Sequence, residues 1–192
     1  MKKIIFASNN KGKVEEVKHI LGDLDIQIIS LVDIDDTIDI EESGDSFEEN
    51  ALIKAEQVFE RFKIPTMADD SGLVVQQLNG APGIYSSRYA RVDGNDKANN
   101  EKLLNELKNY PHPHRAKFVC AAVYFDSEST YTAVGEFAGK IIDEEVGNNG
   151  FGYDPLFVPD GYSVTLAQLE PEIKNRISHR LKAFENLKNK LL

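Results

Sequence analysis

The stretch "PTMADDSGLVV", residues 65–75, places two adjacent carboxylates, Asp69 and Asp70, between two short apolar runs. The runs "TMA" and "LVV" favour strand, and the pair Ser71–Gly72 favours a turn between them. Because consecutive side chains of an extended chain point to opposite faces, we expect only one carboxylate to face a given cleft. One aspartate is then expected to hold the turn. The other, at a strand end, suits Mg²⁺, which prefers one or two carboxylates together with water and phosphate oxygens.

The chain before this stretch alternates strand and helix patterns. "KKIIFA" and "IQIIS" are typical of buried strands, and a helix over about 14–21 is predicted between them. Ser46 followed by Glu49 is a capping box, and the apolar spacing beyond it predicts a helix over 47–62. An acidic surface loop is expected between "IQIIS" and this helix, and it could supply a second carboxylate to the metal. Its acidic residues are Asp33, Asp35, Asp36, Asp39, Glu41, Glu42 and Asp45.

The chain after this stretch contains two longer apolar runs. "KFVCAAVYF" and "TYTAVGEFAG" are separated by the polar turn "DSES", which predicts an antiparallel pair of strands. A helix is predicted over about 96–108, and a closing helix has an apolar face of Leu181, Phe184, Leu187 and Leu191. Helix-connected and hairpin-connected strands together predict an α/β fold with a mixed sheet.

The composition narrows the class of protein. The length of 192 residues fits one domain over 1–192, with room for two lobes. The net charge of -10 would repel a phosphate backbone or an anionic membrane, so neither polymeric nucleic acid nor a membrane is an expected partner. The single cysteine, Cys120, lies in an apolar run, and no segment approaches the length of a membrane span. We therefore expect a cytoplasmic protein.

The opening loop "SNNKGK" lies between a strand and a helix start. Unpaired backbone N–H groups at such a position favour an anion such as phosphate. The residues concerned are Ser8, Asn9, Asn10, Lys11, Gly12 and Lys13. The alternative is that Ser8 or Asn10 only caps the helix while the lysines are solvated. The loop has neither the glycine spacing of a dinucleotide fingerprint nor the pattern of a P-loop.

Two later segments also combine unusual polar and aromatic residues. "GFGYDPLF", residues 150–157, suits an aromatic platform for a base, although aromatic residues more often form core. "EIKNRISHR", residues 172–180, gathers four basic side chains, which form either a solvated face or a site for phosphates or the oxygen edge of a base. His19, His112 and His114 have no metal-ligand spacing, and "YPHPH" is typical of an exposed turn, so we assign these histidines no chemistry.

Six motifs occur in one order along almost the whole chain: "SNNKGK", "ESGDSFEENALIKA", "ADDSGL", "GAPGIYSSRYA", "GFGYDPLF" and "EIKNRISHR". In this combination the sequence resembles the nucleoside-triphosphate pyrophosphatases that remove inosine and xanthosine triphosphates. The resemblance implies hydrolysis between the α and β phosphates, giving a monophosphate and pyrophosphate, with Mg²⁺ as cofactor. It also implies a homodimer and a two-lobed α/β fold around a long mixed sheet with flanking helices, with the substrate in the cleft between the lobes.

The resemblance also implies roles for individual residues. Residues 8 to 13 would hold the phosphates, Glu41 and Asp70 would bind the metal, and Asp70 would act as general base. Ser71 would lie beside the substrate, and Lys54 matches an active-site lysine of the family. The base and sugar would be enclosed by Phe151, Gly152, Tyr153, Asp154, Lys174, His179 and Arg180. The chain departs from the family pattern at Arg91 and Asn149, where glycine is common.

Two other functions fit parts of the sequence. A phosphoribosyltransferase-like enzyme also places adjacent acidic residues at a strand end, but its pair leads into a small-residue phosphate loop, whereas "DDSGLVV" returns to apolar residues. A regulatory module that binds a purine nucleotide without hydrolysing it could use the same loops and aromatic side chains.

Overall fold

The computed structural model describes residues 2–34, 38, 40–92 and 94–191. The chain divides into two compact units, which are described separately. Unit 1 comprises Met1–Asp70, Cys120–Gly135 and His179–Leu192, and unit 2 comprises Ser71–Val119 and Glu136–Ser178. Three strands contribute to both units: β3 (Thr66–Val75), β4 (His114–Phe125) and β5 (Thr130–Ile141).

Unit 1 contains strands β1 (Lys2–Phe6) and β2 (Ile26–Ser30) beside the first part of β3. The strand order is β2-β1-β3-β4-β5, and β1 is parallel to both β2 and β3. β4 and β5 are neighbours joined by residues 126–129, a connection short enough to make them antiparallel. The predicted α/β fold with a mixed sheet is therefore confirmed.

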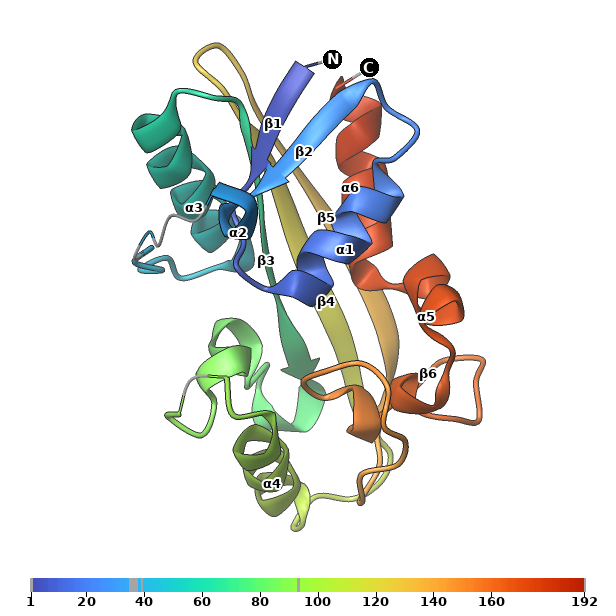
Figure 1. The fold of residues 1–192 in the computed structure, drawn as a ribbon. Helices are drawn as coiled ribbons and strands as arrows, with labels where there is room; N and C mark the ends of the chain where they lie inside the picture. The colour runs from blue at the N-terminus through green and yellow to red at the C-terminus, as the bar shows by residue number, and fades with distance from the viewer. Residues whose placement is uncertain (1, 35–37, 39, 93, 192) are drawn as a thin grey trace. The chain divides into compact units, whose positions relative to one another are not determined.

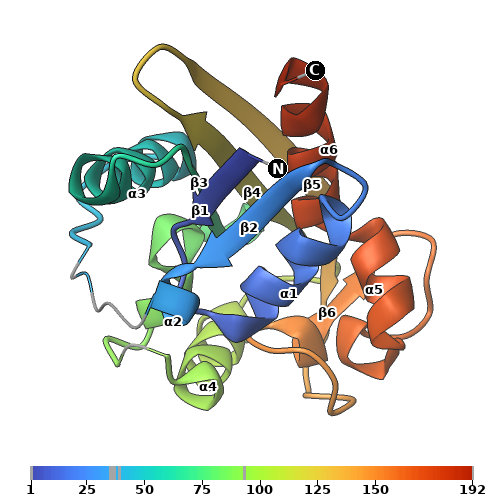
Figure 2. The same cartoon turned by 45° about the horizontal axis from the view of Figure 1, so that its top comes forward.

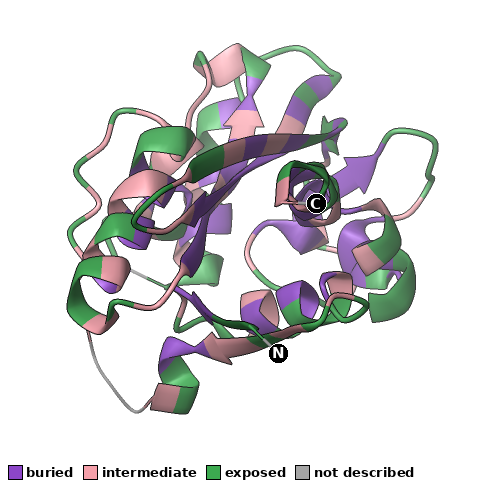
Figure 3. Ribbon diagram, turned by 90° about the horizontal axis from the view of Figure 1, so that it is seen from above, coloured by how far each residue is buried: buried purple, intermediate pink, exposed green. Residues whose placement is uncertain are grey.

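The helices of unit 1 cover both faces of this sheet. They are α1 (Lys11–Ile20), α2 (Leu31–Ile34), α3 (Phe47–Phe62) and α6 (His179–Leu191). Ile4 and Phe6 of β1 belong to one apolar cluster with α1 and α6, whereas Ile5 belongs to another with α3. The side-chain alternation of a strand explains this division. Figures 1 and 2 show α1 and α6 beside each other and α3 on the other side of β1. In Figure 3, buried positions follow the strands and the inner faces of these helices.

Unit 2 combines the later part of β3 with short helical turns and one longer helix. Its elements are η1 (Gln76–Leu78), η2 (Gly83–Arg88), α4 (Asp96–Leu107), η3 (Asp154–Leu156), β6 (Phe157–Pro159), η4 (Leu166–Gln168) and α5 (Pro171–Ile177). β6 pairs with β5 in antiparallel register, with Gly139 opposite Pro159. One apolar cluster contains Leu73 and Val75 of β3, Leu103 of α4, and Tyr153 and Phe157.

The predicted start of one helix is confirmed, and another helix starts earlier than predicted. α3 has the predicted limits, and the Ser46 hydroxyl accepts a hydrogen bond from the Glu49 N–H at 3.1 Å. α1 begins at Lys11, three residues earlier than predicted, because the Asn10 side chain caps it by accepting from the Lys13 N–H. The predicted cap at Asn10 is thus confirmed, but the solvated lysines of that alternative are wrong for Lys13, whose Nζ lies 3.2 Å from Asp69 Oδ2. Among the described residues, no helix has both the length and the apolar character needed to cross a membrane.

Three local predictions were wrong or incomplete. Ser71–Gly72 forms no turn, because β3 continues without a break from Thr66 to Val75. The predicted closing helix, α6, begins at His179, inside the basic segment, and residues 172–177 of that segment form most of a separate helix, α5. In the acidic segment Asp33 belongs to the short helix α2, while Asp35, Asp36 and Asp39 lie outside the described residues. Arg91, where the resemblance led us to expect glycine, has a φ of 63°, a left-handed conformation that glycine adopts easily.

Candidate functional site

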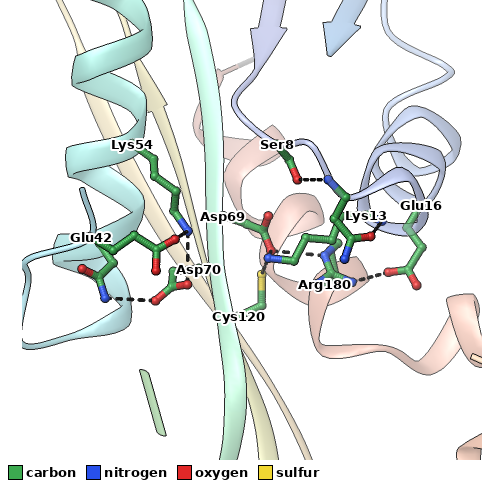
Figure 4. A network of polar contacts seen from close by, with 11 residues as sticks. Ser8, Lys13, Glu16, Glu42, Lys54, Asp69, Asp70, Cys120 and Arg180 are labelled. Carbon is green, nitrogen blue, oxygen red and sulfur yellow. Dashed lines mark hydrogen bonds and ion pairs between the residues drawn. The ribbon is translucent and has the colours of Figure 1, made fainter. Parts of the chain in front are cut away.

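Asp69 and Asp70 lie next to each other on β3, both buried, and their side chains point to opposite faces of the strand (Figure 4). This arrangement follows from strand alternation, as predicted. The side chain of Asp70 faces α3, and that of Asp69 faces α1 and α6. Because no turn follows, the predicted role of one aspartate as a turn former is wrong.

Asp70 lies in a polar network with residues of α3 and the preceding loop. The Lys54 Nζ is 3.2 Å from Asp70 Oδ1 and 3.0 Å from Glu42 Oε1, so it bridges the two carboxylates. The Asn50 side-chain amide donates to Asp70 Oδ2 at 3.3 Å, and the Asn50 Oδ1 accepts from the Gly44 N–H at 2.9 Å. Asn50 therefore connects the loop to the carboxylate.

Burial and the neighbouring charges shift the pKa values of Asp70 and Lys54 in this network. Burial raises the pKa of Asp70, and this effect exceeds the opposing attraction of Lys54 and Lys13. Burial acts to lower the pKa of Lys54, but the neighbouring carboxylates of Asp70, Asp69 and Glu42 raise it overall. Lys54 therefore remains a cation, while Asp70 exchanges its proton closer to neutral pH than an ordinary aspartate does.

Asp69 belongs to a second buried network. Its Oδ2 is 3.2 Å from Lys13 Nζ and 3.3 Å from Arg180 Nε. Arg180 also forms an ion pair with Glu16 of α1, and the Cys120 thiol lies 3.8 Å from the same Asp69 oxygen. Arg180 is only 2% exposed, so its guanidinium is held by carboxylates of the protein itself. The buried carboxylates raise the pKa of Arg180 against the opposite effect of burial.

The opening loop joins β1 to α1 beside this second network. The Ser8 hydroxyl accepts from the Asn10 N–H at 3.2 Å, and Asn9, Asn10 and Lys11 are exposed. Gly12 and Lys13 are half-buried in the first turn of α1, which contains no acidic residue. A ten-residue helix with cationic side chains and no carboxylate at its start favours an anion there.

The carboxylates near Asp70 include a residue that the sequence did not single out. Glu41, the predicted metal ligand, is exposed, and its backbone carbonyl accepts a long contact of 3.5 Å from the Gln57 amide. Glu42 is the residue joined to Asp70 through Lys54. The donors are hard carboxylate oxygens, a set that fits Mg²⁺. The adjacent positions of Glu41 and Glu42 in a loop gave no signal that could distinguish them.

A separate group of predicted residues lies within unit 2. Asp154 is buried, and its Oδ2 accepts from the Phe151 N–H at 2.9 Å and is 2.7 Å from Lys174 Nζ. The same ammonium lies 4.5 Å from the centre of the Phe151 ring, which is 38% exposed. Tyr153 is buried, and its hydroxyl donates to the Ser86 carbonyl at 2.9 Å. Phe151 is thus the exposed aromatic ring of the loop, and Tyr153 belongs to the core.

The tight geometry of this loop depends on a glycine. Gly150 has a φ of 79°, and a Cβ there would lie 2.1 Å from Asp154 Oδ2. The Gly152 N–H donates to Asp96 Oδ2 at 2.7 Å, which fixes the other side of Phe151. Of the remaining predicted residues, Ser71 is half-buried on β3 and His179 is buried at the start of α6.

Comparison with known proteins assigns the chain to a family. The profile of the Ham1 family matches residues 4–190. A dITP/XTP pyrophosphatase of Oceanobacillus iheyensis is 48% identical over 190 residues, covering 97% of this chain and 96% of that protein. A dITP/XTP pyrophosphatase of Clostridium perfringens is also 48% identical, over 199 residues, covering 100% of this chain and 98% of that protein.

Solved structures agree with this assignment. The Staphylococcus aureus Ham1 protein has a TM-score of 0.89 and 43% identity, covering 99% of this chain and 98% of that chain. A HAM1 protein from Coxiella burnetii has a TM-score of 0.91 and 38% identity, covering 100% of this chain and 98% of that chain. Both the matched sequence profile and the matched fold extend over nearly all residues, and the chain therefore belongs to the Ham1 family.

Proposed function

We propose that this protein hydrolyses inosine, deoxyinosine and xanthosine triphosphates between the α and β phosphates, releasing the monophosphate and pyrophosphate. The proposal is supported by full-length similarity to proteins named dITP/XTP pyrophosphatase. The observation that carries it is the Asp70 network: a buried carboxylate with a raised pKa, fixed by Asn50 and joined through Lys54 to Glu42. Perturbed carboxylates with specific charged partners are typical of catalytic sites.

In this proposal Asp70 is the general base that orients and deprotonates the attacking water. Its buried carboxylate is fixed by Asn50 and Lys54, so it can orient a water molecule and accept its proton. Asn50 holds Asp70 Oδ2 in place, and Lys54 contributes a fixed positive charge beside the carboxylate. Positive charge placed in advance stabilises the negative charge that accumulates as a phosphoanhydride bond breaks.

Mg²⁺ is the proposed cofactor, held by Asp70 with Glu41 as predicted or with Glu42. When bound, it would polarise the phosphoryl oxygens and neutralise charge on the leaving pyrophosphate. The phosphate chain would also be bound by groups that do not hold the metal ion. These are Ser8, the first turn of α1, and the side chains of Lys11 and Lys13. Asp69 and Arg180 would hold Lys13 in position, since both belong to its buried network. This assigns Arg180 a positioning role.

The loop of unit 2 is the proposed element for base recognition. The Phe151 ring has the exposure needed to stack on a flat base, and Lys174 supplies a donor held by Asp154 beside that ring. A donor directed at a 6-oxygen would be left unpaired against the 6-amino group of adenine, which disfavours ATP. The homodimer and the cytoplasmic location implied by the resemblance and composition belong to the same proposal.

Incubation with inosine triphosphate and Mg²⁺, followed by separation of the products, tests the proposal. We expect one inosine monophosphate and one pyrophosphate per substrate consumed, with no orthophosphate. A requirement for a phosphoribosyl acceptor would instead indicate a transferase, and binding without turnover would indicate a regulatory module. Either result would overturn the proposed function.

A further inference from the structure

Unit 2 contains a histidine–carboxylate cluster away from Asp70 and from the Phe151 loop in the sequence. It consists of His112, His114 and Asp143, each of which offers one ligand atom, and these atoms all lie within 4.8 Å of one another. The sequence alone did not reveal the cluster, because Asp143 follows His114 by an entire hairpin. β4 begins at His114, and Asp143 follows the end of β5 at Ile141, so neighbouring strands bring the residues to one edge.

The separations within the cluster match those required by a small metal ion. His112 Nε2 is 3.3 Å from Asp143 Oδ2, and His114 Nε2 is 3.8 Å from Asp143 Oδ1. An ion with tetrahedral bonds of about 2.0–2.1 Å needs ligand atoms roughly 3.3–3.4 Å apart. The two imidazole rings have their centroids 4.2 Å apart and are inclined by 48°. Small side-chain rotations would therefore complete the ligand geometry.

One histidine of the cluster is buried, and the other two side chains are exposed to solvent. The His114 side chain is 3% exposed, whereas those of His112 and Asp143 are 60% and 71% exposed. The buried His114 Nδ1 has no hydrogen-bond partner among the described residues. The His114 nitrogen that faces Asp143 is Nε2, so a metal ion bound there would leave Nδ1 to hydrogen-bond an ordered water, the second contact that metal-bound histidines usually make. The exposed side of the cluster gives an ion access from solvent.

The backbone that carries these side chains is fixed by other contacts. The Gln77 amide donates to the carbonyls of Pro111 and Pro113, at 3.1 and 2.9 Å, on either side of His112. On the opposite strand, the Ile142 N–H donates to the Leu156 carbonyl at 2.9 Å. All three proposed ligands are therefore next to backbone groups that are already hydrogen-bonded, which lowers the entropy lost on binding.

We propose that His112, His114 and Asp143 form a binding site for a divalent transition metal of the Zn²⁺ class. Two imidazoles and one carboxylate favour Zn²⁺, Ni²⁺ or Cu²⁺ over Mg²⁺, which prefers oxygen ligands. Three protein ligands leave a further position for water. The site is distinct from the carboxylates proposed for Mg²⁺, and bound metal would tie the start of β4 to the end of β5.

Calorimetric titration of the metal-free full chain with Zn²⁺, in the presence of saturating Mg²⁺, tests this site. We expect one Zn²⁺ per chain, with affinity reduced at least about tenfold by His112→Gln and by Asp143→Asn. Both side chains are exposed, so these variants are expected to fold, whereas the buried His114 is not needed for the test. His19→Gln is the matched control, because His19 is an exposed histidine of α1 outside the cluster.

Co²⁺ gives a second measurement that does not depend on enzymatic activity. The wild-type protein is expected to develop the intense visible absorption of a four-coordinate Co²⁺ site, and His112→Gln is expected to lose it while His19→Gln keeps it. The absence of Zn²⁺ binding to the wild type would overturn the proposal. Unchanged binding in both His112→Gln and Asp143→Asn would also overturn it, as would an equal loss in His19→Gln.

Discussion

Asp69 and Asp70 are neighbours in the chain, yet they have different charged partners because they face opposite sides of β3. Asp69 lies between Lys13 and Arg180, so its charge serves to hold two cations. Asp70 lies near Lys54 and has Glu42 within the same network, where burial raises its pKa. Of the two, Asp70 is therefore the residue whose charge can change during a reaction.

The first residue-scale prediction concerns the pKa of Asp70. Burial raises this pKa, and the positive charge of Lys54 partly opposes that effect. Replacing Lys54 with Met removes the opposing charge, so Asp70 should take up its proton at a higher pH than in the wild type. A ¹³C NMR titration of the aspartate carboxyls without Mg²⁺ would measure the shift. Lys188→Met, which removes a partner of the surface residue Asp23, is the control. An unchanged or lower midpoint for Asp70 in Lys54→Met would contradict the description of this network.

The second residue-scale prediction concerns Arg180. Replacing it with Gln leaves the buried carboxylates of Asp69 and Glu16 without their main partner, and should lower the free energy of unfolding by about 3–5 kcal/mol. Arg115→Gln is the matched control, because the Arg115 pair with Asp160 is exposed and should contribute at most about 1 kcal/mol. Urea denaturation measures both variants. Equal losses in the free energy of unfolding would show that the buried Arg180 network stabilises the fold no more than the exposed Arg115 pair does.

Several of these assignments could not have been made from the sequence. The motif order identified Asp70 and Lys54, but Arg180 pairs with Glu16, 164 positions away in the chain. A run of basic residues gives no information about such a partner. Glu41 and Glu42 are adjacent acidic residues of one loop, and only the fold joins Glu42 to Lys54.

At the scale of elements, α3 and β3 show where local signals suffice and where they fail. α3 was predictable because its cap, its apolar face and its end are encoded within the helix itself. β3 was predicted as two pieces, because Ser71 and Gly72 have high turn propensity. The neighbouring strand β4 and the burial of Leu73 and Val75 in an apolar cluster override that propensity, because β1 pairs with β3 only at Thr66 and Met67.

The element-scale prediction concerns the end of α3. Lys63 follows the helix with a φ of 54°, a left-handed conformation that costs a lysine more than a glycine. Lys63→Gly should therefore raise the free energy of unfolding by about 0.5–1 kcal/mol. Lys63→Ala is the control, because it loses the same exposed ion pair with Glu60 without gaining backbone freedom. Thermal unfolding measures the change, and a Gly variant no more stable than the Ala variant would contradict the strain argument.

At the scale of the whole molecule, the net charge is -10, yet three cationic side chains are buried. Lys54, Lys174 and Arg180 are all buried and paired with carboxylates, although the protein as a whole is acidic. The net negative charge disfavours polymeric nucleic acid, whereas the first turn of α1, which has no acidic residue, is the proposed local site for the phosphates. Composition alone gives no positive information about the substrate, for which the order of the motifs was needed.

The whole-molecule prediction concerns substrate preference. With Mg²⁺ at saturation, kcat/KM for ITP, dITP and XTP should exceed that for ATP by at least roughly a hundredfold, because a buried donor left unpaired against a 6-amino group is costly. A panel at matched concentrations that includes GTP measures the selectivity. Equal consumption of ATP, GTP and ITP would leave the reaction type intact and remove the role in cleansing the nucleotide pool.

If the proposed function is right, hydrolysis of the nucleotide depends on Asp70 together with a divalent ion. The most direct measurement compares pyrophosphate release from ITP by the wild type and by Asp70→Asn, with nucleotide binding measured on the same samples. Loss of a general base should reduce kcat by at least about a hundredfold. We expect Asp70→Asn to show this loss while it still binds ITP measurably, and near-normal turnover by this variant would remove Asp70 from the mechanism.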